Sequence, residues 1–378
     1  MSELSALPGL LLPWYEENKR DLPWRRDRDP YHVWLSEIML QQTRVEAVVE
    51  YYHRFLAALP TIRALAETDE ETLLKLWEGL GYYNRARNLQ KAARVVVEQY
   101  GGAFPQTPNE IRTLPGVGPY TAGAIGSICF DLPLPAVDGN VLRVLTRVLE
   151  DGANIDKAST KAAVEDRLRP LYTPGVCGAL TQALMELGAC VCLPNGAPQC
   201  GRCPLKGICR AGRNGTWTQF PVRDPKKARK IVHKTVLILQ CGDRFAIRKR
   251  GKAGLLAGLW EFPNVDVSMT HQSDPDKAAQ AALQTAADLG AAPTDLSMQT
   301  GYVHVFTHVE WHMTGYLILC RKTPDAFVWV TREQLETDYA LPSAFRPFWE
   351  LAVGSSKAVL IDLSESTRLI FGKGDVLS

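Results

Sequence analysis

Four cysteines crowd into one stretch of 18 residues and limit what this chain can fold into. Cys192, Cys200, Cys203 and Cys209 follow the spacing C-x7-C-x2-C-x5-C. Four thiolates on one short loop can surround a metal centre, either a tetrahedral zinc or a cubane iron–sulfur cluster. Zinc ribbons usually carry two C-x2-C pairs and this run has one, so the spacing favours the cluster. Two disulfides or four unrelated thiols are the alternative, which the lack of a signal-peptide pattern disfavours.

The composition describes a soluble globular protein with room for two or three cores. The chain has 378 residues, of which 46% are hydrophobic and 22% are charged. No apolar run is long enough to span a bilayer, so no membrane association is expected. The other cysteines are scattered, which suits a reducing, cytoplasmic location without a targeting signal. They are Cys129, Cys177, Cys190, Cys241 and Cys320.

Positive charge is concentrated in one segment. Between Arg202 and Lys234 there are ten Lys or Arg residues and one acid, Asp224, whereas the whole chain carries a net charge of only +2. A basic stretch on a nearly neutral protein indicates a polyanionic partner. A solvated linker is the alternative.

The hydrophobic pattern changes once along the chain. From about residue 5 to 210, apolar residues recur at helical spacing between short Pro/Gly breaks. After Ile231 the period becomes two, with a buried strand at 236–239 and an alternating strand through 303–312. One helix interrupts, at about 275–289, with Asp274 as its N-cap. The pattern predicts an all-α domain at 1–212, a basic linker at 213–230 and an α+β domain at 231–378.

A glycine-rich turn in the helical part is suited to binding a phosphate. The run Leu114-Pro115-Gly116-Val117-Gly118 lies between a short helix at 109–113 and a longer one at 120–130. Glycines allow a tight turn that leaves N–H groups exposed, and the following helix N-terminus adds free donors. Such a site positions a DNA backbone without reading its sequence. A purely structural helix connection has a similar pattern.

The runs LPGVGPYTAGAI and VDGNVLRVLTR resemble the helix-hairpin-helix DNA glycosylases. The cysteine loop narrows the resemblance to the branch that carries a [4Fe–4S] cluster. QQTRVE, GLGYYNRARNL and MELGACVC narrow it further, to adenine DNA glycosylases of the MutY type. The resemblance covers nearly the whole chain and implies Leu114, Gly116 and Gly118 as phosphate contacts. The first cysteine gap is one residue longer than the family's usual gap, which leaves Cys190 as an alternative first ligand to Cys192.

Two carboxylates are candidates for catalysis. Glu37 is the only charged residue in VWLSEIMLQQ. This pattern is equally compatible with an acid on the solvent-exposed side of a helix and with a buried acid. Asp138 precedes a helix and is best explained, on local sequence, as its N-cap. The resemblance implies that these two form the catalytic pair. Glu37 would protonate adenine at N7, and ionised Asp138 would stabilise the oxocarbenium-like sugar or bond to it transiently.

Two further residues match supporting positions of the family, Asn140 and Tyr120. In the lyase branch, which endonuclease III represents, a lysine replaces Tyr120 and attacks the sugar. The tyrosine therefore predicts hydrolysis without a lyase step.

The target base must leave the duplex before its glycosidic bond can be reached. Gln41, Gln42 and Tyr82 match family residues that probe or wedge the base stack, although ordinary packing would also explain Tyr82. The resemblance implies that the adenine pocket is formed by Leu22, Trp24, Arg25 and Gln182.

The C-terminal part resembles a Nudix fold, beginning at GLWEFP. The following helix, AAQAALQTAADLG, lacks the glutamates that hold magnesium in Nudix hydrolases, so a MutT-related recognition domain without pyrophosphatase activity is expected. The family contacts 8-oxoguanine through F-S-H on a hairpin, which Phe306-Thr307-His308 matches. If 303–312 forms one strand, His304, His308 and His312 share a face, but no neighbouring cysteine or carboxylate cluster supports zinc there.

Together these features predict a base-excision enzyme that acts as a monomer near the nucleoid. It would remove adenine mispaired with 8-oxoguanine or guanine in double-stranded DNA. The alternatives are an endonuclease III-like glycosylase with lyase activity, a fused Nudix hydrolase, and a non-catalytic iron–sulfur protein that binds DNA or senses redox state.

Overall fold

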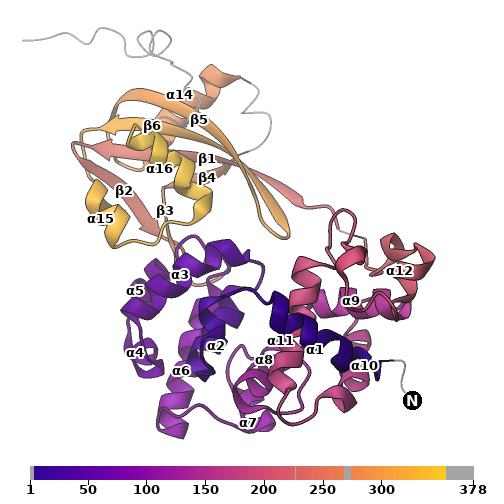
Figure 1. The fold of residues 1–378 in the computed structure, drawn as a ribbon. Coiled ribbons are helices and arrows are strands. Elements are labelled where there is room, and N and C mark those ends of the chain that lie inside the picture. The colour runs from indigo at the N-terminus through magenta and orange to yellow at the C-terminus, as the bar shows by residue number, and fades with distance from the viewer. Residues whose placement is uncertain (1–3, 226, 268–273, 355–378) are drawn as a thin grey trace, which may run out of the picture. The chain divides into compact units, whose positions relative to one another are not determined.

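The computed structural model describes residues 4–225, 227–267 and 274–354, so the predicted end of the second domain, 355–378, lies outside the described residues. The chain forms two compact units (Figure 1). One comprises Met1–Thr68 and Asn84–Lys226, and the other comprises Asp69–Tyr83 and Lys227–Ser378. Within the described ranges, no helix has the length and apolar character needed to cross a membrane.

The first unit is helical, as the 3.6-residue pattern predicts. Its α-helices are α1 (Leu7–Asn18), α2 (Pro30–Met39), α3 (Val45–Ala58), α4 (Ile62–Glu67), α6 (Asn84–Tyr100), α7 (Pro108–Thr113), α8 (Pro119–Phe130), α9 (Gly139–Leu149), α10 (Ala158–Leu168), α11 (Cys177–Cys190) and α12 (Arg210–Asn214).

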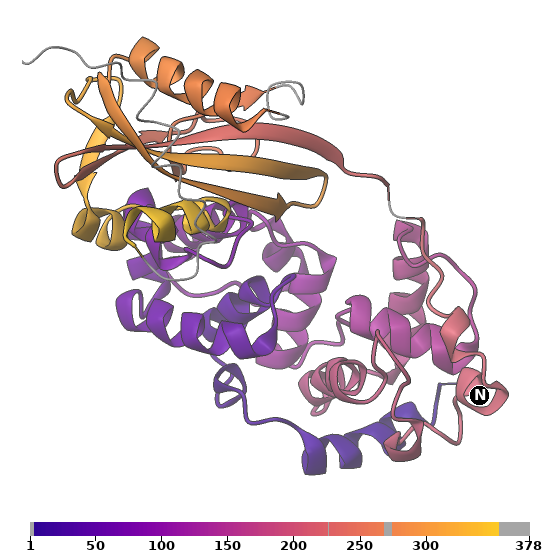
Figure 2. The same ribbon diagram turned by 90° about the horizontal axis from the view of Figure 1, so that it is seen from above.

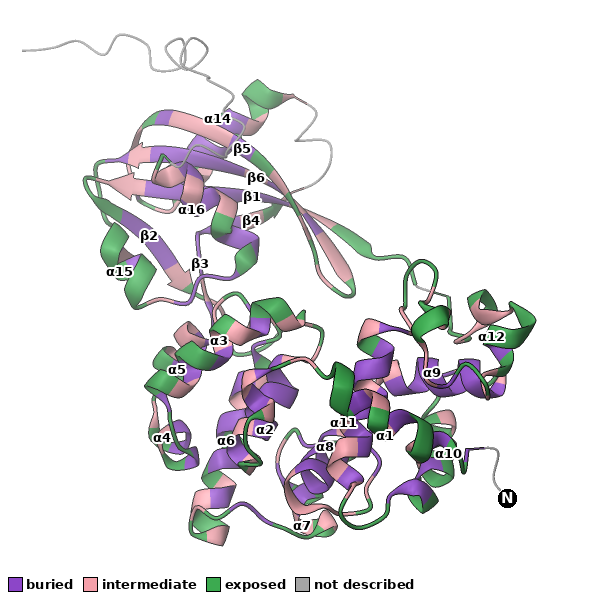
Figure 3. Cartoon of the chain, viewed as in Figure 1, coloured by how far each residue is buried: buried purple, intermediate pink, exposed green. Residues whose placement is uncertain are grey.

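Helix α9 lies in the core of this unit. Every residue from Val141 to Leu149 is buried, although the sequence predicts an amphipathic helix (Figure 3). Its two arginines, Arg143 and Arg147, are tolerated there because they donate to backbone carbonyls of the cysteine loop and its surroundings. Helix α9 is therefore fixed on all sides and positions the residues at its N-terminus rigidly.

The predicted glycine-rich turn joins α7 to α8. Gly116 has φ +77°, and a Cβ there would lie 2.8 Å from the Asn88 Cβ, so both the backbone conformation and the space require glycine. Gly118 is the N-cap of α8 and Pro119 is its first residue. The turn thus begins α8 at a defined place, one residue before Tyr120.

The second unit is built on a mixed sheet whose main order is β3-β2-β1-β6-β5, with β4 also paired to β1 and β7 to β2. The β1–β6 pair is parallel and the other pairs are antiparallel. The strands are β1 (Lys230–Cys241), β2 (Arg244–Lys249), β3 (Trp260–Glu261), β4 (Asn264–Val267), β5 (Pro293–Val305), β6 (Val309–Cys320) and β7 (Val328–Thr331).

Helices cover both faces of this sheet (Figure 2). Helix α14 (Pro275–Asp288) packs against one face, while α15 (Arg332–Thr337) and α16 (Arg346–Ala352) pack against the other. Asp274 caps α14 by accepting from the Lys277 backbone N–H at 3.3 Å, as predicted. The all-α plus α+β fold class predicted from the sequence is confirmed.

The prediction of one alternating strand through 303–312 is wrong. Strand β5 ends at Val305 and β6 begins at Val309, and between them the Phe306 N–H donates to the Val309 carbonyl at 2.9 Å. Apolar and polar residues keep alternating through the turn because Phe306 packs against the core cluster. A period-two pattern therefore does not reveal that the chain reverses direction there. His304, His308 and His312 therefore do not share one strand.

Segment Asp69–Tyr83, which includes α5 (Glu70–Leu76), belongs to the second unit although the sequence predicts the helical domain to continue through it. Glu71 pairs with Lys249 and accepts from Trp260 Nε1 at 2.9 Å. Lys75 Nζ donates to the Tyr339 carbonyl at 3.0 Å. The boundaries at 212 and 230 stay predictions, but this grouping was not anticipated.

Candidate active site

The helical unit contains a cavity of about 740 Å³. Its walls come from the α1–α2 connection, α2, the first turns of α8 and α9, α11, and residues near the end of the unit. The residues of this unit that were predicted to act in catalysis, to form the adenine pocket or to wedge the base stack all line this cavity. They are Leu22, Trp24, Arg25, Glu37, Gln41, Gln42, Tyr120, Asp138, Asn140 and Gln182.

Glu37 is a buried acid and does not lie on the solvent-exposed side of its helix. Every residue of α2 from Val33 to Met39 is buried, and Glu37 is only 6% exposed. Burial raises the pKa of Glu37 to about 7, although a hydrogen bond donated by the Tyr120 hydroxyl opposes that rise. A carboxyl with this pKa retains a proton near neutral pH.

Asp138 is both the N-cap of α9 and a residue of the cavity wall. As the predicted N-cap of α9, its Oδ1 accepts from the Val141 backbone N–H at 2.8 Å. The same carboxylate lines the cavity, where its Oδ2 accepts from Asn140 Nδ2 at 2.7 Å. Burial raises the pKa of Asp138, and these two hydrogen bonds to the ionised form oppose the rise. The carboxylate is therefore held in a fixed orientation by two donors that stabilise its anion against the effect of burial.

Asn140 is itself positioned by a buried arginine. Its Oδ1 accepts from Arg143 Nη2 at 2.8 Å. Arg143 also donates to the carbonyls of Cys192 at 2.7 Å and Gly188 at 2.8 Å. A short series of hydrogen bonds thus runs from Asp138 to the start of the cysteine loop.

The predicted base pocket contains an acid that the sequence analysis missed. Glu186, on α11, has a fully buried side chain that accepts from Arg20 at 2.7 and 2.9 Å and from Arg25 at 2.7 Å. Burial by itself would raise the pKa of Glu186, but the hydrogen bonds from both arginines lower it to about 2. A lone acid within the apolar run of α11 was the available signal, the same signal that singled out Glu37.

The apolar walls of this pocket are Leu22 and Trp24, both buried. Gln182 Oε1 accepts from the Tyr15 hydroxyl at 3.1 Å, which orients the amide. An apolar slot bounded by an arginine and an amide is suited to a flat heterocycle with donors and acceptors on its edge.

The predicted wedge residues are divided between the units. Gln41 and Gln42 line the cavity of the helical unit, and Gln42 has φ +61°. Tyr82 belongs to the second unit, where it is 49% exposed and has φ +47°. Its hydroxyl lies 2.8 Å from Thr307 Oγ1, so the predicted wedge and the predicted lesion contact are neighbours.

The predicted phosphate turn does not line the cavity. Leu114 is buried and secures the turn, while Gly118 begins α8, the helix that carries Tyr120 into the cavity. The turn and the cavity are thus linked through one helix.

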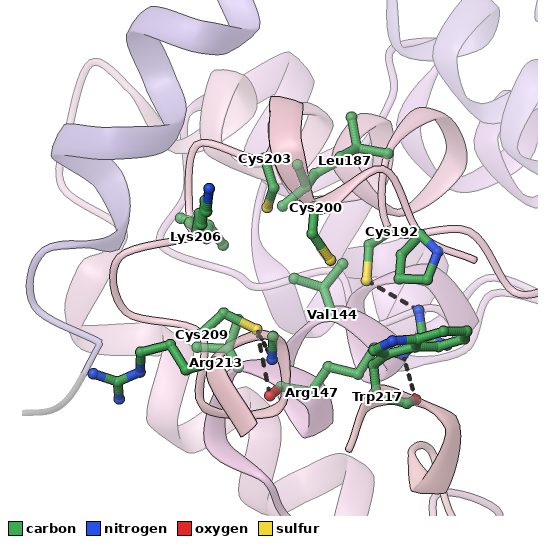
Figure 4. Close-up of a pocket in the computed structure, with 15 residues that line it drawn as sticks. Val144, Arg147, Leu187, Cys192, Cys200, Cys203, Lys206, Cys209, Arg213 and Trp217 are labelled. Carbon is green, nitrogen blue, oxygen red and sulfur yellow. Dashed lines mark hydrogen bonds between the residues drawn. The ribbon is translucent and has the colours of Figure 1, made fainter. Parts of the chain in front are cut away.

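A second cavity, of about 110 Å³, is lined by Cys192, Cys200, Cys203 and Cys209 (Figure 4). Cys190 does not line it, since the Cys190 thiol donates to Glu186 instead, at 3.7 Å. Among the described residues, no three His, Cys, Asp or Glu side chains lie close enough to hold a single metal ion. Four cysteines spaced around a cavity fit a polynuclear centre better than a tetrahedral zinc, whose thiolates lie about 2.3 Å from one ion.

The fold and the cavity define a helix-hairpin-helix repair enzyme. Residues 35–170 match the HhH-GPD superfamily of base excision DNA repair proteins, and residues 235–351 match the NUDIX domain. A thermostable thymine-DNA glycosylase of known structure superposes with a TM-score of 0.52 at 29% identity, covering 56% of this chain and 97% of that chain.

The relatives narrow the class further. The rat adenine DNA glycosylase is 35% identical over 94% of this chain and 80% of its own length, and the human one is 35% identical over 92% and 75%. The chain belongs to the adenine DNA glycosylase family, and it is a DNA glycosylase of base excision repair.

Proposed function

We propose that this glycosylase hydrolyses adenine mispaired with 8-oxoguanine, using Glu37 as general acid and Asp138 as the anion that stabilises the sugar. One observation carries the proposal: a buried carboxyl, Glu37, and a half-buried one, Asp138, line one cavity and have different hydrogen-bonding environments. The pKa of Glu37 is raised to about 7, whereas Asp138 accepts hydrogen bonds from a backbone N–H and an amide. Such a division supplies an acid and an anion at the same pH.

The reaction then needs only these groups and water. Glu37 donates its proton to N7 of the extruded adenine, so the base leaves as a neutral molecule when the bond between C1′ and N9 breaks. The anion of Asp138 stabilises the positive charge that develops on the sugar. Water adds its hydroxide to C1′ and returns a proton to Glu37. Arg25, Gln182 and Glu186 hold the purine edge, while Trp24 and Leu22 cover its face.

The reaction ends at hydrolysis because the cavity presents Tyr120 where the lyase branch has a lysine. A phenol that donates to Glu37 does not form a Schiff base. The experiment is a timed assay on a duplex with one labelled adenine. Free adenine should appear at once and strand breaks only after heat or alkali. Strand breaks without that treatment would favour the lyase alternative.

The rate of adenine release should depend on pH through the protonation of Glu37. Release is expected to fall tenfold per unit above about pH 7, because Glu37 then loses the proton it must donate. Tyr120→Phe removes a hydrogen bond that lowers the Glu37 pKa, so this alkaline limb should move to higher pH. Single-turnover rates between pH 5 and 9 measure the shift, and an unmoved limb in Tyr120→Phe would contradict the assignment of the acid.

We also propose that the hairpin tip of the second unit reads the lesion. Phe306, Thr307 and His308 lie at the β5–β6 turn, and the Tyr82 hydroxyl is within hydrogen-bond distance of Thr307. Helix α14 carries no glutamate, which supports a recognition domain without Nudix hydrolysis.

Thr307→Val should lower the preference for adenine opposite 8-oxoguanine over adenine opposite guanine by about tenfold, the effect of one hydrogen bond to a buried partner. The two duplexes are compared at equal protein concentration. Thr300→Val, on β5, is the control for the same substitution away from the turn. An unchanged preference in Thr307→Val would remove this residue from lesion recognition.

The four cysteines would hold a [4Fe–4S] cluster, which would supply order to the loop rather than a chemical step. That loop carries the exposed basic residues Arg202, Lys206 and Arg210. They would then face the DNA backbone when the protein binds a duplex as a monomer.

Cys203→Ala should reduce iron to trace amounts and weaken duplex binding at least tenfold. Iron analysis and the visible absorbance of the purified protein measure the first effect, and fluorescence anisotropy measures the second. Cys241→Ala, outside the loop, should keep both properties. Full iron content in Cys203→Ala would contradict the ligand set.

A further inference from the structure

Part of the predicted linker forms a fixed wall of the helical unit. The Ile155 backbone N–H donates to the Val222 carbonyl at 3.0 Å, and the Asp224 backbone N–H donates to Asp156 at 3.1 Å. Asn154 Nδ2 donates to Asp224 Oδ1 at 2.7 Å. These three hydrogen bonds on both sides of residue 223 fix its backbone against the loop between α9 and α10.

Arg223 extends from this wall into the active-site cavity. A Cβ on Gly139, the residue after Asp138, would lie 3.9 Å from Arg223 Nη2. The only ion pair of Arg223 within the described chain is with Asp156 at 3.9 Å, and these side chains are 55% and 40% exposed. An exposed pair at that distance contributes little, so the guanidinium keeps donors for a ligand.

The other cations of the cavity differ in their partners. Arg20 and Arg25 are neutralised by the buried carboxylate of Glu186 and face the base pocket. Arg223 lies instead beside the first residue of α9, and exposed Lys161 lines the same cavity. The positive charge available to a ligand therefore lies beside Asp138 rather than beside the purine edge.

We propose that Arg223 binds a backbone phosphate of the extruded nucleotide and thereby positions the sugar against Asp138. The inference rests on the proposed function, which brings C1′ of that nucleotide to Asp138. A nucleotide held there carries its own phosphates within a few ångströms of its sugar. The guanidinium fork matches two phosphate oxygens, and its backbone is fixed, so the contact restrains the sugar at little entropic cost.

Duplex binding tests the contact independently of chemistry. The DNA carries a non-hydrolysable 2′-fluoro analogue of the target deoxyadenosine, and dissociation constants are measured between 50 and 200 mM salt. In Arg223→Ala the slope of log K against log salt should decrease in magnitude by about 0.9, with affinity about tenfold lower at the lowest salt. Arg223→Lys should recover most of the affinity. Arg167→Ala, which removes another exposed arginine with an ion pair to Asp151 at 3.2 Å, should match wild type.

A methylphosphonate at each flanking position locates the phosphate. At one of the two positions the neutral linkage should weaken wild-type binding about tenfold and should not weaken Arg223→Ala further. The proposal is overturned if Arg223→Ala behaves as Arg167→Ala, or if every methylphosphonate effect adds to that of Arg223→Ala.

Asp156→Asn separates the phosphate contact from support of the loop. It removes the ion pair and keeps the cation, so it should bind at least as tightly as wild type. A loss equal to that of Arg223→Ala would mean that the arginine only supports its loop, which overturns the proposal. Adenine release by the wild-type protein tests the proposed function separately. If the wild type releases adenine but Arg223→Ala binds the duplex as Arg167→Ala does, only the phosphate contact is refuted.

Discussion

Glu37→Gln should slow adenine release about 10³-fold while leaving duplex affinity within about twofold. The amide is nearly isosteric and still accepts the hydrogen bond of the Tyr120 hydroxyl, so the α2 packing is preserved. It has no proton to give to N7, so adenine must leave as an anion. Single-turnover release of labelled adenine from a duplex with 8-oxoguanine opposite measures the loss.

Glu67→Gln is the matched control, because Glu67 is exposed and pairs only at the surface with Arg63. It should react at the wild-type rate. A Glu37→Gln variant that retains more than about a tenth of wild-type activity would show that another group protonates the base.

Asp138→Asn should also reduce release by about 10³-fold, since the developing sugar cation loses the anion that stabilises it. Asparagine is as good an N-cap as aspartate, so the free energy of unfolding should fall by no more than about 1 kcal/mol. Asp138→Ala loses the cap as well as the charge and should be less stable than Asp138→Asn by about 1 kcal/mol. Comparing the two variants separates the structural function of this carboxylate from its chemistry.

Asp274→Asn repeats the same substitution at the N-cap of α14, far along the chain from the cavity residues. It should leave release unchanged. Urea unfolding monitored by circular dichroism gives the stabilities, and the release assay gives the rates. Equal activity of Asp138→Asn and Asp274→Asn would refute the assigned function of Asp138.

Much of the fold follows from local rules that the sequence displays. The turn at 114–118 and the cap at Asp274 are where propensity predicts them, because each depends on residues within a few positions. The resemblance implied a hairpin at 306–308, but the alternating pattern did not show it, because Phe306 remains a core residue through the turn. A period-two pattern reports which side chains are buried, not whether the backbone reverses between them.

The site required more than local pattern. Burial of Glu37 depends on α8, which brings Tyr120 from 83 positions away, and no periodicity in α2 encodes that contact. The resemblance to known glycosylases supplied the pairing with Asp138. Glu186 was overlooked because its arginine partners lie 161 and 166 positions earlier, so its sequence neighbourhood shows only an acid in an apolar helix.

The grouping of Asp69–Tyr83 with the sheet unit has a consequence for protein engineering. Glu71 pairs with Lys249 and Glu78 accepts from the Leu341 backbone N–H, so the segment that precedes Tyr82 is matched to groups more than 170 positions later. A chimaera that exchanges only the C-terminal domain between relatives would separate these partners. Grafting should succeed when the donor supplies both Asp69–Tyr83 and the C-terminal domain. The unit that can be exchanged between relatives is then encoded by two separate parts of the gene.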